Sequence, residues 1–222
     1  HLDPVHVTNR FLGAARASGA QLRIPCELRE LQFRHGHLTA AVTSQGAVPL
    51  DRLVIAAGAD TPRLLELCGF RLRLRHAPGI LAHSTPLPAL TRIIHDGPGN
   101  LVFKQMADGR IVGTDASEPP NLPVHEAIRA QPIDFPDEAL RTLHGNRILG
   151  KLATLLPAVG GASLEWLSLG FRPMPLDDLP VVGALPGVGD VHVAVTHSGV
   201  TLAPILGRYV TREVLDEARV EV

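Results

Sequence analysis

The residue with the clearest chemical signature lies in the string GFRPMPLDDLPVVG, residues 170–183, which places Arg172 in an apolar stretch. An unpaired buried cation is costly, so an arginine in such a stretch requires a partner. The carboxylate of a bound ligand would serve through paired hydrogen bonds. A structural ion pair with Asp177 or Asp178 is the alternative. The sequence therefore makes Arg172 a candidate carboxylate-binding residue.

A second candidate site lies where a predicted strand ends at His197 and a helix begins at Gly199. The first N–H groups of a helix have no acceptor within it, and the helix dipole places partial positive charge there. Gly199 allows another group to approach the backbone closely. An ordinary helix capped by Ser198 is the alternative. For His197, a plain hydrogen-bonding role is the alternative to a site role.

Other chemistry finds little support in the sequence. Among eleven histidines, His35 and His37 form the only close pair, and no cysteine or carboxylate cluster accompanies them. We therefore interpret them as a surface turn and predict no metal site. The sequence contains no GxSxG motif of a serine hydrolase. It also contains no GxGxxG, because the glycine-rich residues 183–189 have the wrong spacing and include a proline.

Composition excludes several further classes of protein. Hydrophobic residues make up 45% of the 222 residues, enough for a sizeable core. The net charge of −1 argues against nucleic acid as a main partner. The longest apolar runs, 53–57 and 191–195, fall far short of the about 18 residues of a membrane span. No signal peptide is recognisable. Cys26 and Cys68 lie far apart and outside any CxxC, which predicts free thiols and a cytoplasmic location.

The first 70 residues contain elements typical of an α/β layer. Asp3 and Pro4 are a helix-start signal, and Gly19 is a plausible stop. The apolar run 53–58 is typical of a strand buried on both faces. The other predicted elements are strands over 21–24 and 27–33, a turn at 35–37, a hairpin over 38–44 and 47–50, and a helix from Thr61 to Gly69.

The middle of the chain has a different character. The sequence of residues 71–115 predicts an antiparallel sheet. Its short alternating segments, separated by turn signals, are 71–75, 80–83, 92–95, 101–105 and 110–114. Five prolines mark residues 116–136 as a connection. The remaining predicted elements are a helix over 137–156, strands over 163–174 and 191–195, and a last helix over 199–217. The predicted fold class is therefore mixed α/β, with an antiparallel sheet inserted into an α/β domain that has few candidate parallel strands.

The string GxRPxxxDxxPxxG over 170–183, followed by a strand and a glycine-led helix, resembles the C-terminal part of FAD-dependent oxidoreductases of the D-amino-acid oxidase superfamily. Glycine oxidases and D-amino-acid dehydrogenases are relatives in that superfamily. The opening Leu2-Asp3-Pro4 helix and the strand over 54–59 are similar to family segments in the same order. The resemblance implies a partial Rossmann-like FAD-binding domain over 1–70 and 173–222, and a substrate domain over 71–172.

For the substrate, the resemblance implies that Arg172 binds a carboxylate and that His197 orients substrate or tunes the flavin. His83 and His95 of the middle sheet are weaker candidates, because histidines at such places usually face solvent. Lys104 and Gln105 depart from an arginine and a proline that relatives often carry there. That departure puts a substrate contact from this segment in doubt.

For FAD, the resemblance implies a contact between the Leu28 backbone and the adenine, and a close approach of Ala57 and Gly58 to the dinucleotide. It also places the start of the last helix against the flavin, where backbone N–H groups would stabilise negative charge on the reduced ring. The residues implied there are Ser198, Gly199, Val200 and Thr201. Simple core packing is the alternative for Leu28, Ala57 and Gly58.

The implied activity is oxidation of an amino acid or related amine by hydride transfer to FAD. The substrate stays open among glycine, D-amino acids, sarcosine, proline and opine-like secondary amines. The electron acceptor stays open among oxygen, a quinone and another protein. Without a GxGxxG loop, we expect the 222 residues alone to hold FAD weakly. The missing segment would precede His1 in the same chain or belong to another chain. The alternatives are a non-catalytic half that requires such a partner, and a cofactor-free remnant that binds a small carboxylate.

Overall fold

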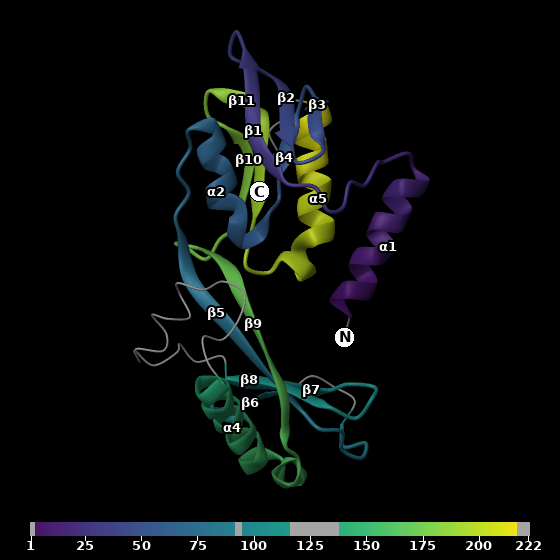
Figure 1. Ribbon diagram of the computed structural model, residues 1–222, viewed down its shortest axis with the longest axis vertical. Coiled ribbons are helices and arrows are strands. Elements are labelled where there is room, and N and C mark those ends of the chain that lie inside the picture. The colour runs from purple at the N-terminus through teal and green to yellow at the C-terminus, as the bar shows by residue number, and fades with distance from the viewer. Residues whose placement is uncertain (1–2, 92–94, 116–137, 217–222) are drawn as a thin grey trace. The chain divides into compact units, whose positions relative to one another are not determined.

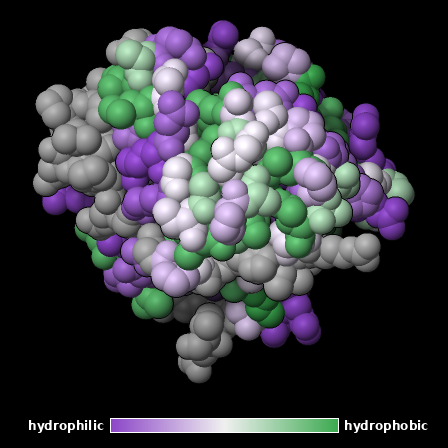
Figure 2. Space-filling model, turned by 90° about the horizontal axis from the view of Figure 1, so that it is seen from below, coloured by the Kyte–Doolittle hydropathy of each residue, from purple (hydrophilic) through white to green (hydrophobic). Residues whose placement is uncertain are grey.

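The computed structural model describes residues 3–91, 95–115 and 138–216. The chain divides into two compact units, each with its own sheets. The central unit is His76–Arg172, and the terminal unit combines Leu2–Arg75 with Pro173–Val222. The predicted connection over 116–136 lies outside the described residues. The face of the molecule in Figure 2 intersperses hydrophobic with hydrophilic residues. Of the described helices, none is long and apolar enough to cross a membrane.

The terminal unit begins with helix α1, Pro4–Ala17, as its cap residues predict. The side chain of Asp3 accepts a hydrogen bond from the His6 N–H at 2.8 Å. Gly19 follows the helix with a φ of +95°. The helix buries none of its residues, so its position depends on little packing within the described residues.

Three antiparallel strands follow, β1 Leu28–Arg34, β2 His37–Thr43 and β3 Gly46–Pro49. The predicted hairpin of β2 and β3 is confirmed, and β1 and β2 pair across the turn predicted at 35–37. Gly36 and Gly46 supply the positive φ that these two turns require. The strand predicted over 21–24 is wrong, since no strand is formed there. Ile24 is 77% exposed, and such a short run without a neighbouring strand to bond has no reason to remain extended.

A second sheet in the terminal unit has the order β10-β11-β4, with β10 Val181–Leu185, β11 Val188–Val195 and β4 Leu53–Ile55. β11 and β4 are parallel, whereas β10 and β11 are antiparallel. The expectation that β4 is buried on both faces is wrong, because Val54 is 40% exposed while Ile55 is 3% exposed. β4 therefore packs on the core through one face only.

Helices complete the terminal unit (Figure 1). α2, Thr61–Leu65, continues in a 3-10 turn to Cys68 and ends at Gly69, whose φ is +78°. α5, Gly199–Asp216, packs against β10 and β11. Short 3-10 helices in the chain cover Gly58–Asp60, Glu66–Cys68, Pro98–Asn100 and Pro157–Gly161.

The central unit contains a five-stranded sheet of order β6-β7-β8-β5-β9. Its strands are β5 Leu74–Ser84, β6 His95–Gly97, β7 Leu101–Gln105, β8 Ile111–Asp115 and β9 Leu164–Pro175. The pairings resolved among β5 to β8 are antiparallel, as predicted. Two segments predicted separately, 71–75 and 80–83, contribute to the single long strand β5.

Helix α4, Glu138–Leu155, covers one face of this sheet. Ile148 and Leu152 of the helix are completely buried against Ile111 of β8. Gly113 permits this close packing, because a Cβ there would lie 2.5 Å from Leu152 Cδ1. The other face of the sheet carries no described helix.

The buried histidine of β11 predicts a pH-dependent stability. His192 is 2% exposed, and burial lowers the pKa of its imidazole below the ordinary value of 6.5. In the unfolded chain His192 therefore binds a proton below about pH 6.5, whereas in the folded chain it does so only at lower pH. We expect the unfolding free energy to fall between pH 7 and pH 5, by at most about 1.4 kcal/mol per pH unit from this group. Urea unfolding at several pH values measures it.

His192→Leu should flatten this dependence, whatever it does to stability at pH 7. His6→Leu changes an exposed histidine of α1 and should leave the pH dependence as it was. An unchanged slope in His192→Leu would contradict the prediction.

Candidate functional site

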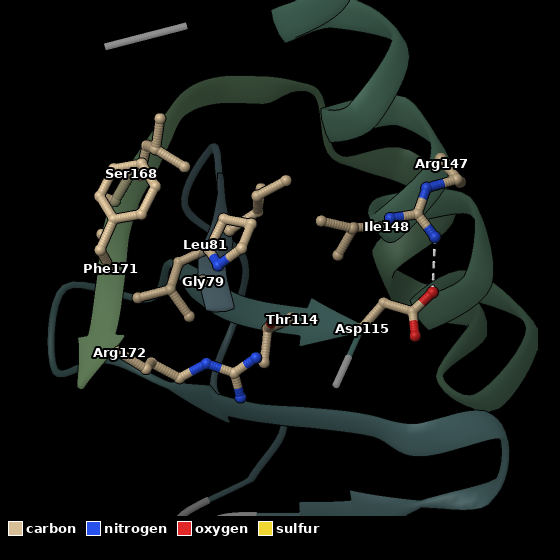
Figure 3. Close-up of a pocket in the computed structure, with 13 residues that line it drawn as sticks. Gly79, Leu81, Thr114, Asp115, Arg147, Ile148, Ser168, Phe171 and Arg172 are labelled. Atoms are coloured by element: carbon tan, nitrogen blue, oxygen red, sulfur yellow. Dashed lines mark hydrogen bonds and ion pairs between the residues drawn. The ribbon is translucent and has the colours of Figure 1, made fainter. Parts of the chain in front are cut away.

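A pocket of about 390 Å³ lies in the central unit and contains the predicted carboxylate-binding residue (Figure 3). Arg172 extends from β9 towards Thr114 of β8, and the pair Asp115–Arg147 lies on another side of the pocket. The full lining is Pro78, Gly79, Ile80, Leu81, Thr114, Asp115, Arg147, Ile148, Ser168, Leu169, Gly170, Phe171 and Arg172.

The charge of Arg172 is not matched by a protein carboxylate in the described part of the chain. Its Nε is buried and has no hydrogen-bond partner there. The two aspartates considered as alternative partners are engaged elsewhere. Asp178 pairs with Arg75, and Asp177 accepts a hydrogen bond from the Leu179 N–H at 3.1 Å. Arg172 is therefore an available cation that lines a pocket.

The other charges around this pocket are paired. The Asp115 side chain is 1% exposed. Its Oδ2 accepts hydrogen bonds from Arg147 Nη1 and Lys151 Nζ, both at 2.5 Å. The two positive charges of Arg147 and Lys151 on α4 exceed the single negative charge of the buried Asp115 carboxylate. With Arg172 added, the pocket has the electrostatic character that suits a monoanion.

The polar residues of the neighbouring strands have distinct places. Lys104 of β7 lies opposite Val112 of β8. Gln105 has a structural role that was not predicted from the amino-acid sequence. Its Nε2 donates to the carbonyls of Pro88 at 2.8 Å and Gly109 at 2.9 Å, and its Oε1 accepts from the Leu90 N–H at 2.7 Å. His83 lies on β5, whereas the His95 side chain is outside the described part.

A second pocket, of about 640 Å³, lies in the terminal unit between α5 and the strands β4 and β11. Four predicted residues line it, namely Gly58, His197, Gly199 and Val200. Sequence reasoning missed the rest of its lining, which is Val54, Ala56, Pro173, Ala194, Val195, Thr196, Ala203, Leu206, Gly207, Val210 and Thr211. The available signal was the run of small residues Gly199, Ala203 and Gly207, which share one helix face at a spacing of four.

The first turn of α5 presents backbone donors. The Ser198 carbonyl accepts the Leu202 N–H at 2.9 Å, so the N–H groups of Gly199, Val200 and Thr201 precede the first intrahelical bond. The Ser198 hydroxyl lies 3.4 Å from His197 Nδ1. A Cβ at Gly199 would meet no atom within 4 Å. The start of α5 is therefore open and rich in backbone donors.

Four predicted cofactor residues lie away from the lining of this pocket. Leu28 begins β1 opposite Thr43 and packs against the core of the terminal unit. Ala57 packs against the same core, and its carbonyl accepts the Asp60 N–H at 3.1 Å. Ser198 and Thr201 flank Gly199 and Val200 without lining the pocket. Gly58, by contrast, lines the pocket and adopts a φ of +57°.

The histidine pair 35 and 37 lies at the β1–β2 turn, where His37 Nδ1 lies 3.1 Å from Asp190 Oδ2. In the described ranges, no group of three metal-ligating side chains is brought together.

Comparisons with known proteins give a consistent result. The FAD dependent oxidoreductase family model matches residues 1–213. The bifunctional protein ThiO/ThiG of Synechocystis sp. is 29% identical over 98% of this chain and 32% of its own length. The uncharacterized oxidoreductase YurR of Bacillus subtilis is 26% identical over 94% of this chain and 55% of its own. The chain thus spans about a third and about half of these two relatives.

Solved structures share the fold at lower identity. L-proline dehydrogenase from P. horikoshii superimposes with a TM-score of 0.79 at 17% identity, over 97% of this chain and 56% of that one. Glycine oxidase from Bacillus cereus gives a TM-score of 0.74 at 20% identity, over 96% of this chain and 55% of that one. The mixed α/β fold class predicted from the sequence is therefore confirmed.

Proposed function

The chain belongs to the FAD dependent oxidoreductase family, and from this we propose that it takes part in the FAD-dependent oxidation of an amino acid or related amine. The observation that carries the proposal is Arg172, whose guanidinium lines a pocket without a protein carboxylate to pair with in the described residues. A substrate carboxylate would supply that charge through two parallel hydrogen bonds.

Binding the carboxylate at Arg172 fixes one end of the substrate and so orients the adjacent carbon that loses hydrogen. Orientation of this kind lowers the barrier because the freedom of the substrate is lost on binding rather than in the reaction. The two cations on Asp115 keep that buried carboxylate from repelling the substrate. No general base is assigned, because a substrate amine that is already neutral requires none.

The residues that would hold FAD lie in the terminal unit. Gly199, Val200 and Thr201 would direct their N–H groups at the electron-rich edge of the flavin ring, and Ser198 would support that turn. Leu28, Ala57 and Gly58 are proposed as backbone contacts to the remainder of the dinucleotide. FAD, when bound, accepts the two electrons of the substrate C–H bond as a hydride.

His197 lines the same pocket as Gly199 and is proposed to orient substrate or tune the charge of the flavin. The proposed partners are a small carboxylate-bearing amine and a dinucleotide-binding segment, in the same chain or in another. A cytoplasmic location, suggested by the two free cysteines, is part of the proposal.

Anaerobic addition of a panel of amines to the FAD-loaded protein, with its dinucleotide-binding segment present, tests the proposed function. We expect bleaching of the flavin absorption band with one or more amino acids or N-alkyl amino acids, and little change with the matched amines that lack a carboxylate. A flavin that no member of the panel reduces would contradict the proposal.

A further inference from the structure

The face of the central sheet that α4 does not cover carries a second polar group besides Arg172. Side chains alternate between the two faces of a strand, and Leu167 and Phe171 of β9 pack towards the α4 core. Ser168, Gly170 and Arg172 therefore share the opposite face. On β5, Ile80 and Ala82 belong to the α4 core, which places Gly79, Leu81 and His83 on this face too.

His83 and Ser168 form a hydrogen-bonded pair on this face, with 2.9 Å between His83 Nε2 and Ser168 Oγ. The imidazole also stacks on the indole of Trp166, with ring centroids 4.3 Å apart and planes inclined by 19°. A hydrogen bond at one edge and a stack on one side fix both the position and the plane of the imidazole.

Trp166 is itself held in place. The Arg110 guanidinium lies over its ring, 5.4 Å from the centroid. Arg110 bonds Glu165 through Nε at 2.7 Å and Nη2 at 2.9 Å, and Asp108 through Nη1 at 2.6 Å. The charge of Arg110 is thus already matched by two carboxylates. The network stabilises the aromatic stack and, among the described residues, leaves one net negative charge beside it.

The imidazole of His83 stays neutral at physiological pH. Burial lowers its pKa below 6.5, and the neighbouring Arg110 lowers it further, against smaller opposing effects of Asp108 and Glu165. The pair therefore offers uncharged donors and acceptors, since a neutral imidazole has one of each and a hydroxyl can both donate and accept.

In the strip of sheet between this pair and Arg172, β5 and β9 present the apolar side chain of Leu81 and two glycines on this face. Ser168 and Arg172 are four residues apart on one strand, about 13 Å between Cα atoms, and the arginine side chain extends across the sheet past Gly79 towards Thr114. Gly170 lies between them, and a Cβ there would meet no atom within 4 Å. Gly79 on the adjacent strand lies beside the Arg172 side chain, because a Cβ at Gly79 would be 3.9 Å from Arg172 Cγ. An extended ligand can lie along this strip.

We propose that the His83–Ser168 pair binds the uncharged polar end of an extended amino acid, such as a side-chain amide, whose carboxylate is held by Arg172. This subsite rests on the proposed function. An amide both donates and accepts, as the pair does. A carboxylate end would lose hydration and would face the net negative charge of Asp108, Arg110 and Glu165. An alkyl end would leave the pair's hydrogen-bonding capacity unused. The pair would therefore select glutamine-like side chains over glutamate-like or norleucine-like ones.

Turnover by the FAD-loaded protein tests this subsite, with both enantiomers of glutamine and of alanine as substrates. Ser168→Ala removes the hydroxyl, and His83→Phe removes both nitrogens while keeping a ring to stack on Trp166. In each variant we expect kcat/KM for glutamine to fall by roughly 2- to 10-fold through KM, with alanine unaffected. Ser163→Ala, an exposed serine just before β9, should change neither. Equal losses for both substrates, or none, would overturn the proposal.

A binding measurement separates failure of the subsite from failure of the proposed oxidation. Trp166 is the only tryptophan of the 222 residues, so its fluorescence reports on the stack directly. Glutaric acid monoamide carries both end groups and no amine to oxidise. It should shift Trp166 emission at lower concentration than butyrate, and this advantage should disappear in Ser168→Ala. If the advantage over butyrate is seen and disappears in Ser168→Ala while no amine reduces the flavin, the subsite is supported and the proposed oxidation is contradicted. No advantage over butyrate would overturn the subsite.

Discussion

Replacing Arg172 by lysine is expected to reduce kcat/KM for carboxylate-bearing amines by roughly ten- to hundredfold, and to affect matched amines without a carboxylate far less. Lysine keeps the positive charge but loses the planar, two-point fit to a carboxylate. A charged hydrogen bond to substrate contributes about 1.5–3 kcal/mol, which corresponds to that range. Steady-state kinetics of the FAD-loaded protein with paired substrates measures the difference.

Arg75→Lys is the matched control, because the guanidinium of Arg75 is already paired with Asp178. It should leave the ratio between the two substrate types unchanged. If Arg172→Lys weakens turnover of both types equally, Arg172 is a structural residue and the carboxylate site lies elsewhere.

Elements governed by local sequence could be predicted well. α1 has its cap at Asp3 and its stop at Gly19, and the hairpins have glycines where a positive φ is needed. The long helix α4 and strand β9 were also predicted to within a residue or two. In each case the information lies within a few residues of the element, so a single sequence contains it.

Elements that depend on a distant neighbour could not be predicted as well. β10 is short and lies between Pro180 and Pro186, and it exists because β11 offers a paired edge. The strand expected over 21–24 has the right composition but no neighbour to bond. β5 continues through Pro78 and Gly79, where the sequence suggested a break, since the sheet continues on both sides.

The same distinction applies to the candidate sites. The sequence could single out Arg172 but left two nearby aspartates open as partners. Asp178 bonds Arg75 instead, a residue 103 positions away, and only the tertiary fold reveals this. The His83–Trp166 stack and the bonds of Asp115 to α4 are likewise contacts between distant segments. Residue type could therefore nominate Arg172, whereas its electrostatic surroundings required the structure.

The start of α5 gives the second large expected effect. Gly199→Val should weaken FAD binding and slow flavin reduction by roughly ten- to hundredfold, because the side chain would hold the flavin edge away from the N–H groups of the first turn. Within the described protein the new side chain has room, since a Cβ at Gly199 meets no atom within 4 Å. Valine also has a higher helix propensity than glycine. The thermal midpoint of the apo protein should therefore not fall.

Gly150→Val tests the same substitution in α4, where a Cβ also meets no atom within 4 Å, and it should change neither FAD affinity nor reduction rate. Thermal melting, FAD titration and anaerobic stopped-flow reduction on the same preparations separate the two roles of Gly199. A loss of FAD affinity with an unchanged apo midpoint places the effect at the cofactor, because the polypeptide alone tolerates the side chain. If instead Gly199→Val melts lower and its bound flavin is reduced at the parental rate, the glycine serves only the fold of this turn, and its backbone donors do not act on the flavin.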